Sequence, residues 1–405
     1  MRSTLIVGAG PAGLYLAYLL KRQDARQQIR IVEQNAADAT FGFGVVFSER
    51  ALDFLREDDE ETHQLLLPQM QRWSDMTLQH RGQRITIDGV GFAAIGRLQL
   101  LQLLQRRLQS IGLGPEYRHT LAQDDALQGY DLVVAADGAH STVRRALAPQ
   151  FGTTIEPLHN RFAWYGTTQR FDSLSQTFIR TEHGCMNAHH YRYAPGTGLP
   201  GRPSGGHGLV PHAAAPVSTF IVECDAATWQ RAGFEQMDDA QTRHCIEHAF
   251  ATVLDGHALI GNKSVWRQFP KVSNRHWSVG NRVLVGDALR TAHFSIGSGT
   301  RLAFEDVIAL ARALREHGRD LPAALAAYEA ARRPVVDKLV AAADRSADWY
   351  EHFAEHMQLE PWDLAWSYIQ RSGRIDPLKL RQASPRFAAG YEAWAAASRG
   401  ADNRG

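Results

Sequence analysis

The chain has 405 residues, 44% of them hydrophobic, which is enough for about two to three domains or lobes with buried cores. Its 44 Lys and Arg residues balance 43 Asp and Glu residues, and the formal charge of +1 excludes the strong field with which nucleic-acid and membrane-surface proteins attract partners. Its apolar runs fall far short of the roughly 20 residues of a membrane span, and a strand beginning at residue 4 leaves no room for a signal peptide. We therefore expect a cytoplasmic protein with neither nucleic-acid nor membrane partners.

The first predicted unit is a strand–turn–helix–strand pattern over residues 3–34, and its turn carries a GxGxxG run. In a dinucleotide-binding fingerprint the first glycine permits the tight turn, the second lets the backbone approach a pyrophosphate, and the third lets the helix pack on the sheet. The pyrophosphate then sits at the helix N-terminus, and an acid closing the second strand binds ribose hydroxyls. The residues predicted to bind the dinucleotide are Gly8, Gly10, Ala12, Gly13 and Glu33.

Further along the chain, an amphipathic helix is predicted at residues 98–111 and a buried parallel strand at residues 131–135. The pattern then changes to β-rich segments separated by turn signals, which indicates an inserted sheet domain with strands at 162–171, 177–180, 187–193 and 217–223. Residues 194–216 contain eleven Gly and Pro residues, which predicts a flexible excursion between two strands. The chain then returns to a parallel strand, a glycine-rich loop and two long helices, with the strand at 282–285 and the helices at 300–316 and 321–356.

The three cysteines do not indicate a cross-linked or metal-bound protein. Cys185, Cys224 and Cys245 are odd in number and lack the spacing of metal ligands. We expect free, partly buried thiols, no disulfide framework and no metal site.

Two further motifs follow predicted strands of the first unit. One is a DG motif, Asp137-Gly138, and the other is a GD motif, Gly286-Asp287, which leads to Gly297-Ser298-Gly299. With the GxGxxG run, they have the order and roughly the spacing found in the single-component flavin hydroxylases, the para-hydroxybenzoate hydroxylase-like family, which the chain resembles over nearly its whole length. The resemblance implies an α/β fold with a Rossmann-like FAD-binding domain of the glutathione-reductase type, an inserted mixed β-sheet substrate domain and C-terminal helices. The corresponding boundaries are 1–154 and 273–345 for the FAD-binding domain, 155–272 for the substrate domain and 346–405 for the C-terminal segment.

The resemblance implies how the GD motif would hold FAD. Asp287 would bind the ribitol, and backbone N–H groups of Gly297, Ser298 and Gly299 would lie against the pyrimidine end of the flavin. The two glycines fit this position because side chains would collide with the ring system. A helix N-terminus there would stabilise the negative charge of reduced flavin.

Other family positions concern the reductant and the FAD phosphates. Asp137 and Gly138 resemble the pair that supports both FAD and the passing nicotinamide cofactor. Arg97, at the head of the leucine-rich helix, matches the family arginine that reaches the FAD phosphates. Because the sequence has no second GxGxxG, NADH or NADPH would bind transiently over the FAD and not in a domain of its own.

The loop after the GD motif departs from the usual family pattern. Arg290, Phe294 and Arg301 stand where the family usually has His, Pro and Asn. The run His-Phe-Ser-Ile-Gly-x-Gly-Thr that begins at residue 293 resembles one branch, which holds the salicyloyl-CoA 5-hydroxylases, the monooxygenase half of the 2-aminobenzoyl-CoA monooxygenase/reductases and the violacein-pathway tryptophan-ring hydroxylase. The bifunctional members carry a reductase-type barrel that this sequence lacks, so we expect hydroxylation without ring reduction.

The resemblance implies a chemistry that needs no protein nucleophile. NADPH or NADH reduces FAD, O₂ adds to form a flavin C4a-hydroperoxide, and the distal oxygen passes to an electron-rich ring. The protein must keep the hydroperoxide dry and place a ring carbon within about 3–3.5 Å of it. His293 and Phe294 precede the flavin-facing glycines and are the predicted catalytic side chains: the histidine would hydrogen-bond or deprotonate the ring substituent, and the phenylalanine would pack on the ring. The alternative for His293 is a histidine satisfied within its own loop.

Candidate substrate-binding residues are predicted in three places. The histidines and tyrosines of the strand at 187–193 alternate, so only every second one faces a pocket. Two aromatic residues in other predicted strands are candidate pocket linings. The basic tail segment 371–386 would bind the phosphates of a CoA thioester, or would be a solvated face if the substrate is a free indole. The candidates are Phe47, Tyr165, His189, Tyr191, Arg371 and Arg374.

We therefore expect an FAD-dependent aromatic-ring monooxygenase, a monomer or homodimer, that consumes NADPH or NADH and O₂. Its expected substrate is a small aromatic molecule, a hydroxybenzoyl- or aminobenzoyl-CoA thioester. An indole or tryptophan-derived biosynthetic intermediate is the alternative substrate. A flavin reductase or dehydrogenase that transfers no oxygen is the alternative from another reaction class.

Overall fold

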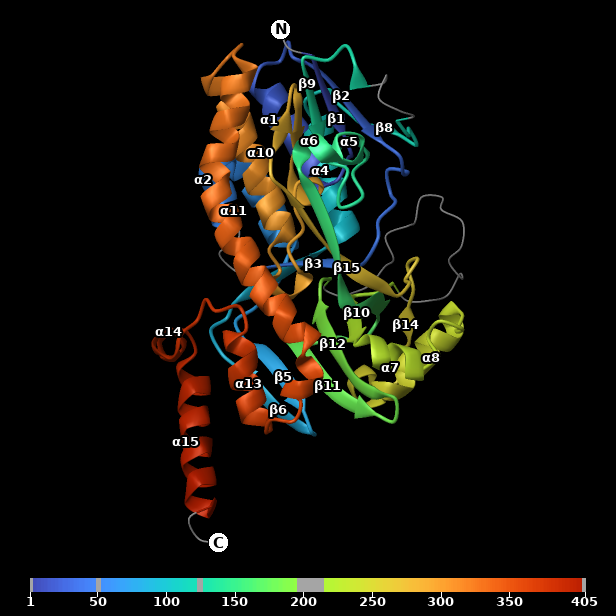
Figure 1. Ribbon diagram of the computed structural model, residues 1–405, viewed down its shortest axis with the longest axis vertical. Coiled ribbons are helices and arrows are strands. Elements are labelled where there is room, and N and C mark those ends of the chain that lie inside the picture. Colours follow the sequence, from blue (N-terminus) through green and yellow to red (C-terminus); the bar gives the residue numbers. More distant parts are fainter. Residues whose placement is uncertain (1–2, 49–51, 122–126, 195–214, 403–405) are drawn as a thin grey trace.

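The structure is a computed structural model that describes residues 3–48, 52–121, 127–194 and 215–402. Figure 1 shows an upper lobe built around one sheet, a lower lobe built around another, and the long helix α11 (Leu321–Glu351) running from the first lobe to the second. The excursion predicted at residues 194–216 lies almost entirely outside the described residues. No helix in the described ranges combines the length and apolarity needed to cross a membrane.

The upper lobe is built on a six-stranded sheet with the order β16-β17-β9-β1-β2-β8. Strand β1 pairs in parallel with β2 and β9, and β17 pairs in parallel with β9, so the parallel strands predicted from the buried apolar runs are confirmed. The strands are β1 (Ser3–Val7), β2 (Gln28–Glu33), β8 (Glu116–Tyr117), β9 (Leu132–Ala135), β16 (Ser278–Val279) and β17 (Arg282–Leu284).

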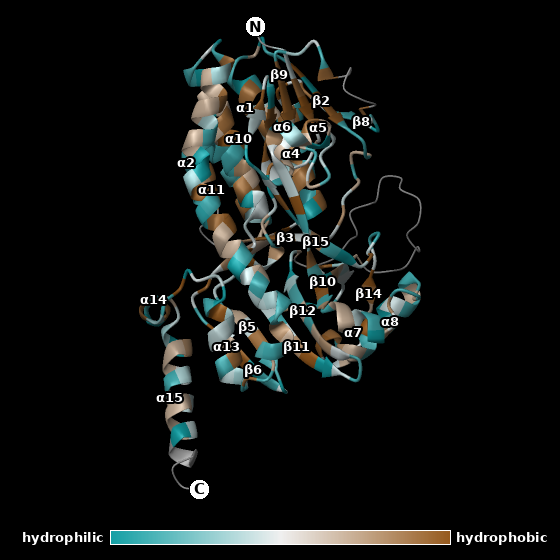
Figure 2. Ribbon diagram, viewed as in Figure 1, coloured by the Kyte–Doolittle hydropathy of each residue, from teal (hydrophilic) through white to brown (hydrophobic). Residues whose placement is uncertain are grey.

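Helices pack around this sheet and form the largest core. Helix α1 contacts both α4 and α10, and α11 packs on α10. Figure 2 shows that the strands of this sheet are mostly hydrophobic, whereas these helices carry hydrophilic as well as hydrophobic residues. The helix expected to run to residue 356 is interrupted at His352, because that residue leaves the helical conformation (φ −112°, ψ 16°). The bounds are α1 (Pro11–Gln23), α4 (Arg97–Gln109), α10 (Gly299–Glu316) and, after the break, α12 (Phe353–His356).

The lower lobe contains a sheet with the order β14-β10-β13-β12-β11-β5-β6, and β15 pairs with β10 off this path. The predicted inserted strands are present, but β5 and β6 come from residues 76–87, a range that the expected boundaries gave to the FAD-binding domain. Strand β5 joins β11 in parallel, a long-range pairing for which the local sequence gives no signal. The strands are β5 (Met76–His80), β6 (Gln83–Ile87), β10 (Thr153–Thr167), β11 (Leu174–Thr181), β12 (Gly184–Arg192), β13 (Ser218–Cys224), β14 (Leu259–Ile260) and β15 (Arg267–Asn274).

Smaller elements join the two lobes and cover the lower sheet. A three-stranded sheet, β3-β7-β4, lies where the chain passes between the lobes, and α13 and α15 contact β6. The three cysteines are free, as predicted. The remaining elements are β3 (Gly44–Ser48), β4 (Gln71–Trp73), β7 (Phe92–Gly96), α2 (Asp53–Asp58), α3 (Glu60–Leu66), α5 (Thr142–Ala146), α6 (Ala148–Phe151), α7 (Ala226–Arg231), α8 (Asp239–Ala249), α9 (Ala251–Leu254), α13 (Pro361–Gln370), α14 (Pro377–Ala383) and α15 (Pro385–Asp402).

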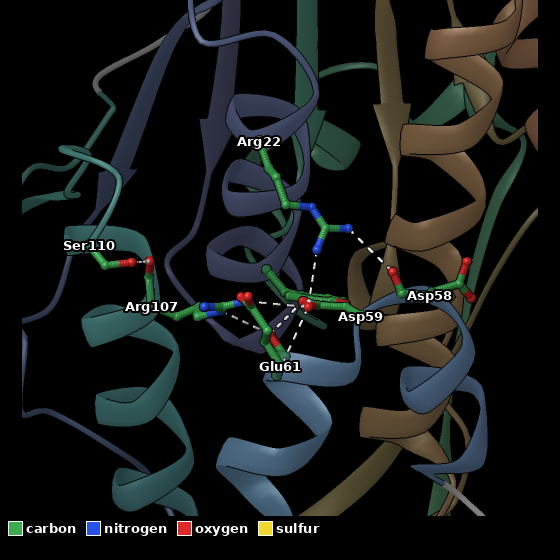
Figure 3. Close-up of polar contacts among 8 residues, drawn as sticks. Arg22, Asp58, Asp59, Glu61, Arg107 and Ser110 are labelled. Carbon is green, nitrogen blue, oxygen red and sulfur yellow. Dashed lines mark hydrogen bonds and ion pairs between the residues drawn. The ribbon is translucent and has the colours of Figure 1, made fainter.

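One buried carboxylate ties α1, α3 and α4 together (Figure 3). Asp59 caps α3, with its side chain only 1% exposed. It pairs with Arg22 of α1 at 3.1 Å and with Arg107 of α4 at 3.4 Å, and it accepts a hydrogen bond from Tyr15 at 3.2 Å. Removing one partner of such a buried ion pair lowers the free energy of unfolding, because the other charge is left without a partner.

We expect Asp59→Ala to lower the free energy of unfolding by about 3–5 kcal/mol, because it leaves the half-buried Arg107 without its inner partner and uncaps α3. Urea titration of the purified protein measures this. Glu61→Ala is the control, since Glu61 also pairs with Arg107 but is 74% exposed; its effect should stay below about 1 kcal/mol. Equal effects of the two variants would contradict the role given to Asp59.

A second buried carboxyl lies in the lower sheet. Glu223 of β13 accepts a hydrogen bond from Asn160 Nδ2 at 2.9 Å. Its other oxygen is buried without a partner among the described residues. Burial raises the pKa of Glu223 to about 7, while the hydrogen bond from Asn160 opposes the shift. The folded state therefore favours the protonated acid.

A carboxyl whose pKa is raised on folding contributes stability below its unfolded pKa, near 4.5, and loses it as pH rises through the folded value near 7. We therefore expect Glu223→Gln to be more stable than the wild type at pH 8, by up to about 3 kcal/mol, and to lose that advantage at pH 5. Urea titrations at the two pH values measure the difference. An advantage of the same size at both would contradict a raised pKa.

Candidate functional site

The glycine-rich turn after β1 has the geometry that its sequence predicts. Gly8 has φ +102°, and a Cβ there would come within 2.5 Å of the Ala136 carbonyl oxygen. A Cβ on Gly13 would come within 2.0 Å of the Gly8 carbonyl oxygen, so the helix packs on the turn only because this residue is glycine. A Cβ on Gly10 would meet no atom within 4 Å, because this residue faces an open cleft. The cleft therefore begins at the N-terminus of α1, where anionic groups bind well.

The cleft has a volume of about 480 Å³ and brings the predicted cofactor residues of all three motifs together. Both oxygens of the Glu33 carboxylate are fixed, one by the Ala9 N–H at 2.9 Å and the other by Asn35. Predicted cofactor residues that line the cleft are Gly8, Gly10, Ala12, Glu33, Arg97, Asp137, Gly138, Asp287 and Gly299.

Several groups in the cleft fit a bound dinucleotide. Asp137 accepts hydrogen bonds from the Thr142 N–H and hydroxyl through one oxygen, at 2.7 and 2.8 Å, while its other oxygen is buried with no partner among the described residues. The guanidinium of Arg97 makes no hydrogen bond within the described ranges, and Asp287 is the carboxylate whose charge acts on it. FAD would fill the open space at Gly10. It would also pair with the unused acceptor of Asp137 and the unused donors of Arg97.

A second cavity of about 560 Å³ continues from the cleft into the space under the lower sheet. The two share Arg97, His140, Asp287 and Gly299 among their lining residues. The wall of this cavity is more apolar than polar, and β10, β12, β15 and the GD loop contribute aromatic rings to it: Phe162, Trp164, Tyr191, Phe269 and Phe294. The site thus joins a polar cleft to an aromatic cavity.

The loop between β17 and α10 lines both the cleft and the cavity. Gly297 has φ +59° and approaches Val46 so closely that a Cβ would lie 3.2 Å from the valine Cγ1. Ser298 caps α10 without a side-chain hydrogen bond to the helix, so backbone N–H groups at that end remain for a ligand. Gly297, Ser298 and Gly299, which the GD motif predicts to lie against the flavin, all line the cavity.

A buried ion cluster fixes this loop, and the sequence analysis missed it. Asp306 of α10 is fully buried; it pairs with Arg290 at 2.6 Å and with Arg332 at 3.2 Å, and it accepts a hydrogen bond from the Gly286 N–H at 3.2 Å. Arg290 was noted only as a departure from the family motif. A buried arginine needs a carboxylate partner. The unusual arginine at position 290 was therefore a signal from which a partner such as Asp306 could have been predicted.

His293 and Phe294 are adjacent, but only one of them lines the cavity. Phe294 does so, with its ring centroid 5.0 Å from that of Phe162. His293 lies behind it, 4.2 Å between centroids, and its Nδ1 is 2.8 Å from the Ser295 hydroxyl. Burial, with a smaller effect from Arg371, lowers the pKa of His293 to about 3, so this imidazole is neutral. The structure thus places His293 among satisfied groups of its own loop.

Strand alternation decides which candidate substrate residues reach the cavity. His189 and Tyr191 line it, whereas His190 points to the other face of β12, against Phe171. On β10 the cavity side belongs to Phe162 and Trp164, and Tyr165 is buried in the core on the opposite face. Phe47 is likewise in the upper core, and Val45 and Val46 line the cavity in its place. The structure does not bring Phe47 or Tyr165 to the site.

The basic tail segment is dispersed in the structure. Arg371 donates to the carbonyl oxygens of Tyr368 and Ser295, at 2.7 and 2.9 Å, and so braces the GD loop from outside the cavity. Arg374 is exposed and lines neither the cleft nor the cavity. The other cations of the segment are in ion pairs: Lys379 with Asp376, Arg381 with Glu392, and Arg386 with Asp75 and Asp88.

Comparison with known proteins agrees with this geometry. A family described as FAD binding domain matches residues 1–87 and 115–343. Salicyloyl-CoA 5-hydroxylase from a Streptomyces species is 38% identical over 390 residues, which cover 93% of this chain and 71% of that protein. The 3-hydroxy-4-methyl-anthranilyl-(aryl-carrier protein) 5-monooxygenase of Streptosporangium sibiricum is 34% identical over 85% of this chain and 88% of its own. Protodeoxyviolaceinate monooxygenase of Chromobacterium violaceum is 31% identical over 92% of this chain and 95% of its own.

Solved structures show the same fold at low sequence identity. The 2-methyl-3-hydroxypyridine-5-carboxylic acid oxygenase superposes with a TM-score of 0.66 over 95% of this chain and 96% of that chain, at 16% identity. A probable FAD-dependent monooxygenase from Pseudomonas aeruginosa superposes with a TM-score of 0.62 over 86% and 96% of the two chains, at 18% identity. The chain therefore belongs to the FAD binding domain family, and within it to the branch of FAD-dependent monooxygenases that contains salicyloyl-CoA 5-hydroxylase and protodeoxyviolaceinate monooxygenase, the branch that its motifs predicted.

Proposed function

We propose that this monooxygenase hydroxylates the ring of an aromatic acyl thioester, a hydroxybenzoyl- or aminobenzoyl-CoA, with NADPH or NADH as reductant. The observation that carries the proposal is the aromatic cavity that opens directly from the dinucleotide cleft past Asp287 and Gly299. FAD, when bound, supplies the redox chemistry: it accepts a hydride from the nicotinamide and activates O₂ for transfer to the ring. Two of the relatives support the thioester, since their names specify an aryl-CoA and an aryl-carrier-protein substrate.

The protein's own residues bind, orient and exclude water. Glu33, Arg97, Asp137 and Asp287 would hold the cofactor in the cleft, and the free N–H groups at the start of α10 would stabilise negative charge beside it. The aromatic rings of the cavity would hold the substrate ring by apolar and edge contacts and keep the reacting atoms dry. We assign ring contact to Phe294, and to His293 the support of Phe294 from behind.

An indolic substrate is the second candidate. It is supported by the similarity to protodeoxyviolaceinate monooxygenase and by the pairing of most tail cations with carboxylates, which leaves few of them for CoA phosphates. A flavin reductase that transfers no oxygen would consume reductant with no oxygenated product.

Aerobic NADPH and NADH oxidation by the holoenzyme, with mass analysis of products, tests the proposal. The panel is 2-hydroxybenzoyl-CoA, 2-aminobenzoyl-CoA, the free acids and indoles. We expect an aryl-CoA to stimulate oxidation and to gain 16 daltons, because the cavity excludes water from the reacting atoms. Stimulation by an indole alone would replace the thioester with the second candidate. Hydrogen peroxide with no oxygenated product from any compound would contradict the hydroxylase proposal.

The cleft makes a separate prediction. Gly10→Leu would place a side chain in the space that Gly10 leaves open at the N-terminus of α1, so we expect FAD content to fall at least about tenfold. The ratio of flavin to protein absorbance measures it. Gly114→Leu is the matched control, because a Cβ on Gly114 also meets no atom within 4 Å but this residue lies outside the cleft. Normal FAD content in Gly10→Leu would show that the cofactor lies elsewhere.

A further inference from the structure

His189 is a buried polar side chain of the cavity wall with no hydrogen-bond partner. It lies on β12, is 5% exposed and lines the aromatic cavity. Neither ring nitrogen has a partner among the described residues. Burial, with a smaller contribution from the charge of Arg371, lowers the pKa of His189 to about 3. The neutral imidazole carries one donor and one acceptor, and both are unused.

The other buried polar groups that line the cavity are already engaged. Tyr191 donates its hydroxyl to the Gly44 carbonyl oxygen at 2.9 Å. The Thr291 hydroxyl donates to the Pro270 carbonyl oxygen at 2.6 Å and accepts from the Val272 N–H at 2.9 Å. The Ser298 hydroxyl donates to the Ile296 carbonyl oxygen at 3.2 Å.

Trp164 also lines the cavity with a buried polar atom that has no partner among the described residues, its Nε1. It differs from His189 in two respects, because it is only partly buried and because an indole N–H donates and never accepts. In the register of the sheet, Ile221 stands between the two, paired with Trp164 on one side and His189 on the other. The wall therefore offers a neutral acceptor at His189 and a donor at Trp164.

His189 also makes no hydrogen bond to the polar side chain nearest to it in the sheet. Its neighbour across the β11–β12 pair is Gln176, which is fully buried and whose amide is also without a partner in the described ranges. A buried polar group left unpaired costs free energy, and native proteins rarely retain one unless a ligand or water completes it. Such a group facing a cavity of aromatic rings marks where a polar substituent of an aromatic ligand belongs.

We propose that His189 recognises the hydroxyl or amino substituent of the aromatic ring, with its imidazole accepting a hydrogen bond from that O–H or N–H. This inference rests on the proposed function, because it names the residue that would recognise the ring substituent within that cavity. A site built to hydrogen-bond such a group discriminates against the analogue that lacks it, because the analogue leaves the imidazole unpaired.

Binding of matched ligands to the oxidised holoenzyme tests this, with the change in flavin absorbance as the readout. The ligands are 2-hydroxybenzoyl-CoA, 2-aminobenzoyl-CoA and unsubstituted benzoyl-CoA. In the wild type we expect the substituted thioesters to bind about tenfold more tightly than benzoyl-CoA. In His189→Leu the preference should fall below about twofold, and in His189→Gln, which retains a donor and an acceptor, part of it should return.

Two control variants separate recognition from structure. Trp164→Phe removes the unpartnered indole N–H and should keep the preference for the aminobenzoyl ligand. His190→Leu changes the same residue type on the other face of β12, where Nε2 bonds the Thr177 hydroxyl at 3.0 Å, and should also keep the preference. The thermal unfolding midpoint should fall in His190→Leu but not in His189→Leu, because only the former loses a hydrogen bond.

Retention of the tenfold preference in His189→Leu, or its absence in the wild type, would overturn the inference. If no aryl-CoA binds but an indole does, the proposal of a thioester substrate is wrong. The binding comparison is then made between a hydroxyindole and indole. A preference for the hydroxyindole that is lost in His189→Leu would support the role of His189, and no such loss would contradict it. Binding of none of these ligands would overturn both the inference and the proposed function.

Discussion

The buried Asp306 carboxylate holds the loop on which both halves of the site depend. It bridges Arg290 of the loop and Arg332 of α11, and it accepts the Gly286 N–H at the point where β17 ends. The loop passes close to Val46 and leads into α10, whose first N–H groups remain free. Two glycines of the loop have positive φ. The two buried ion pairs, with the hydrogen bond from Arg371 on the outer side, hold this loop in place.

The loop lines two environments with different chemistry. On one side is a cleft of backbone N–H groups, carboxylates and Arg97, suited to a charged dinucleotide. On the other is a cavity that is more apolar than polar and has several aromatic rings in its wall, suited to a planar ring. The lower sheet supplies part of that wall from one face, while its opposite face packs on α8 and α9 through a separate core. One sheet therefore serves as scaffold and as substrate surface.

Neutral histidines are a consequence of this arrangement. His189 and His293 are both buried near Arg371, and burial lowers the pKa of each to about 3. His189 thus presents the cavity with a hydrogen-bonding group that is neutral. His293 has its partner in Ser295, whose hydroxyl in turn contacts Ser346 of α11 at 2.8 Å. His189 has none, and this difference separates a histidine that serves the loop from one that faces the ligand.

The sequence by itself determined the cofactor half of this protein. The glycines at 8, 10 and 13, the terminal Glu33, and the DG and GD motifs act through local geometry, since each needs only a strand end, a tight turn and a helix start. The tertiary structure decided the substrate half. Trp164 lines the cavity while Tyr165 is buried behind it, because one residue along a strand reverses the side to which a side chain points. Likewise, the pairing of β5 with β11 and the ion pair between Arg290 and Asp306 join segments that are separate in the sequence. No local sequence pattern specifies such contacts.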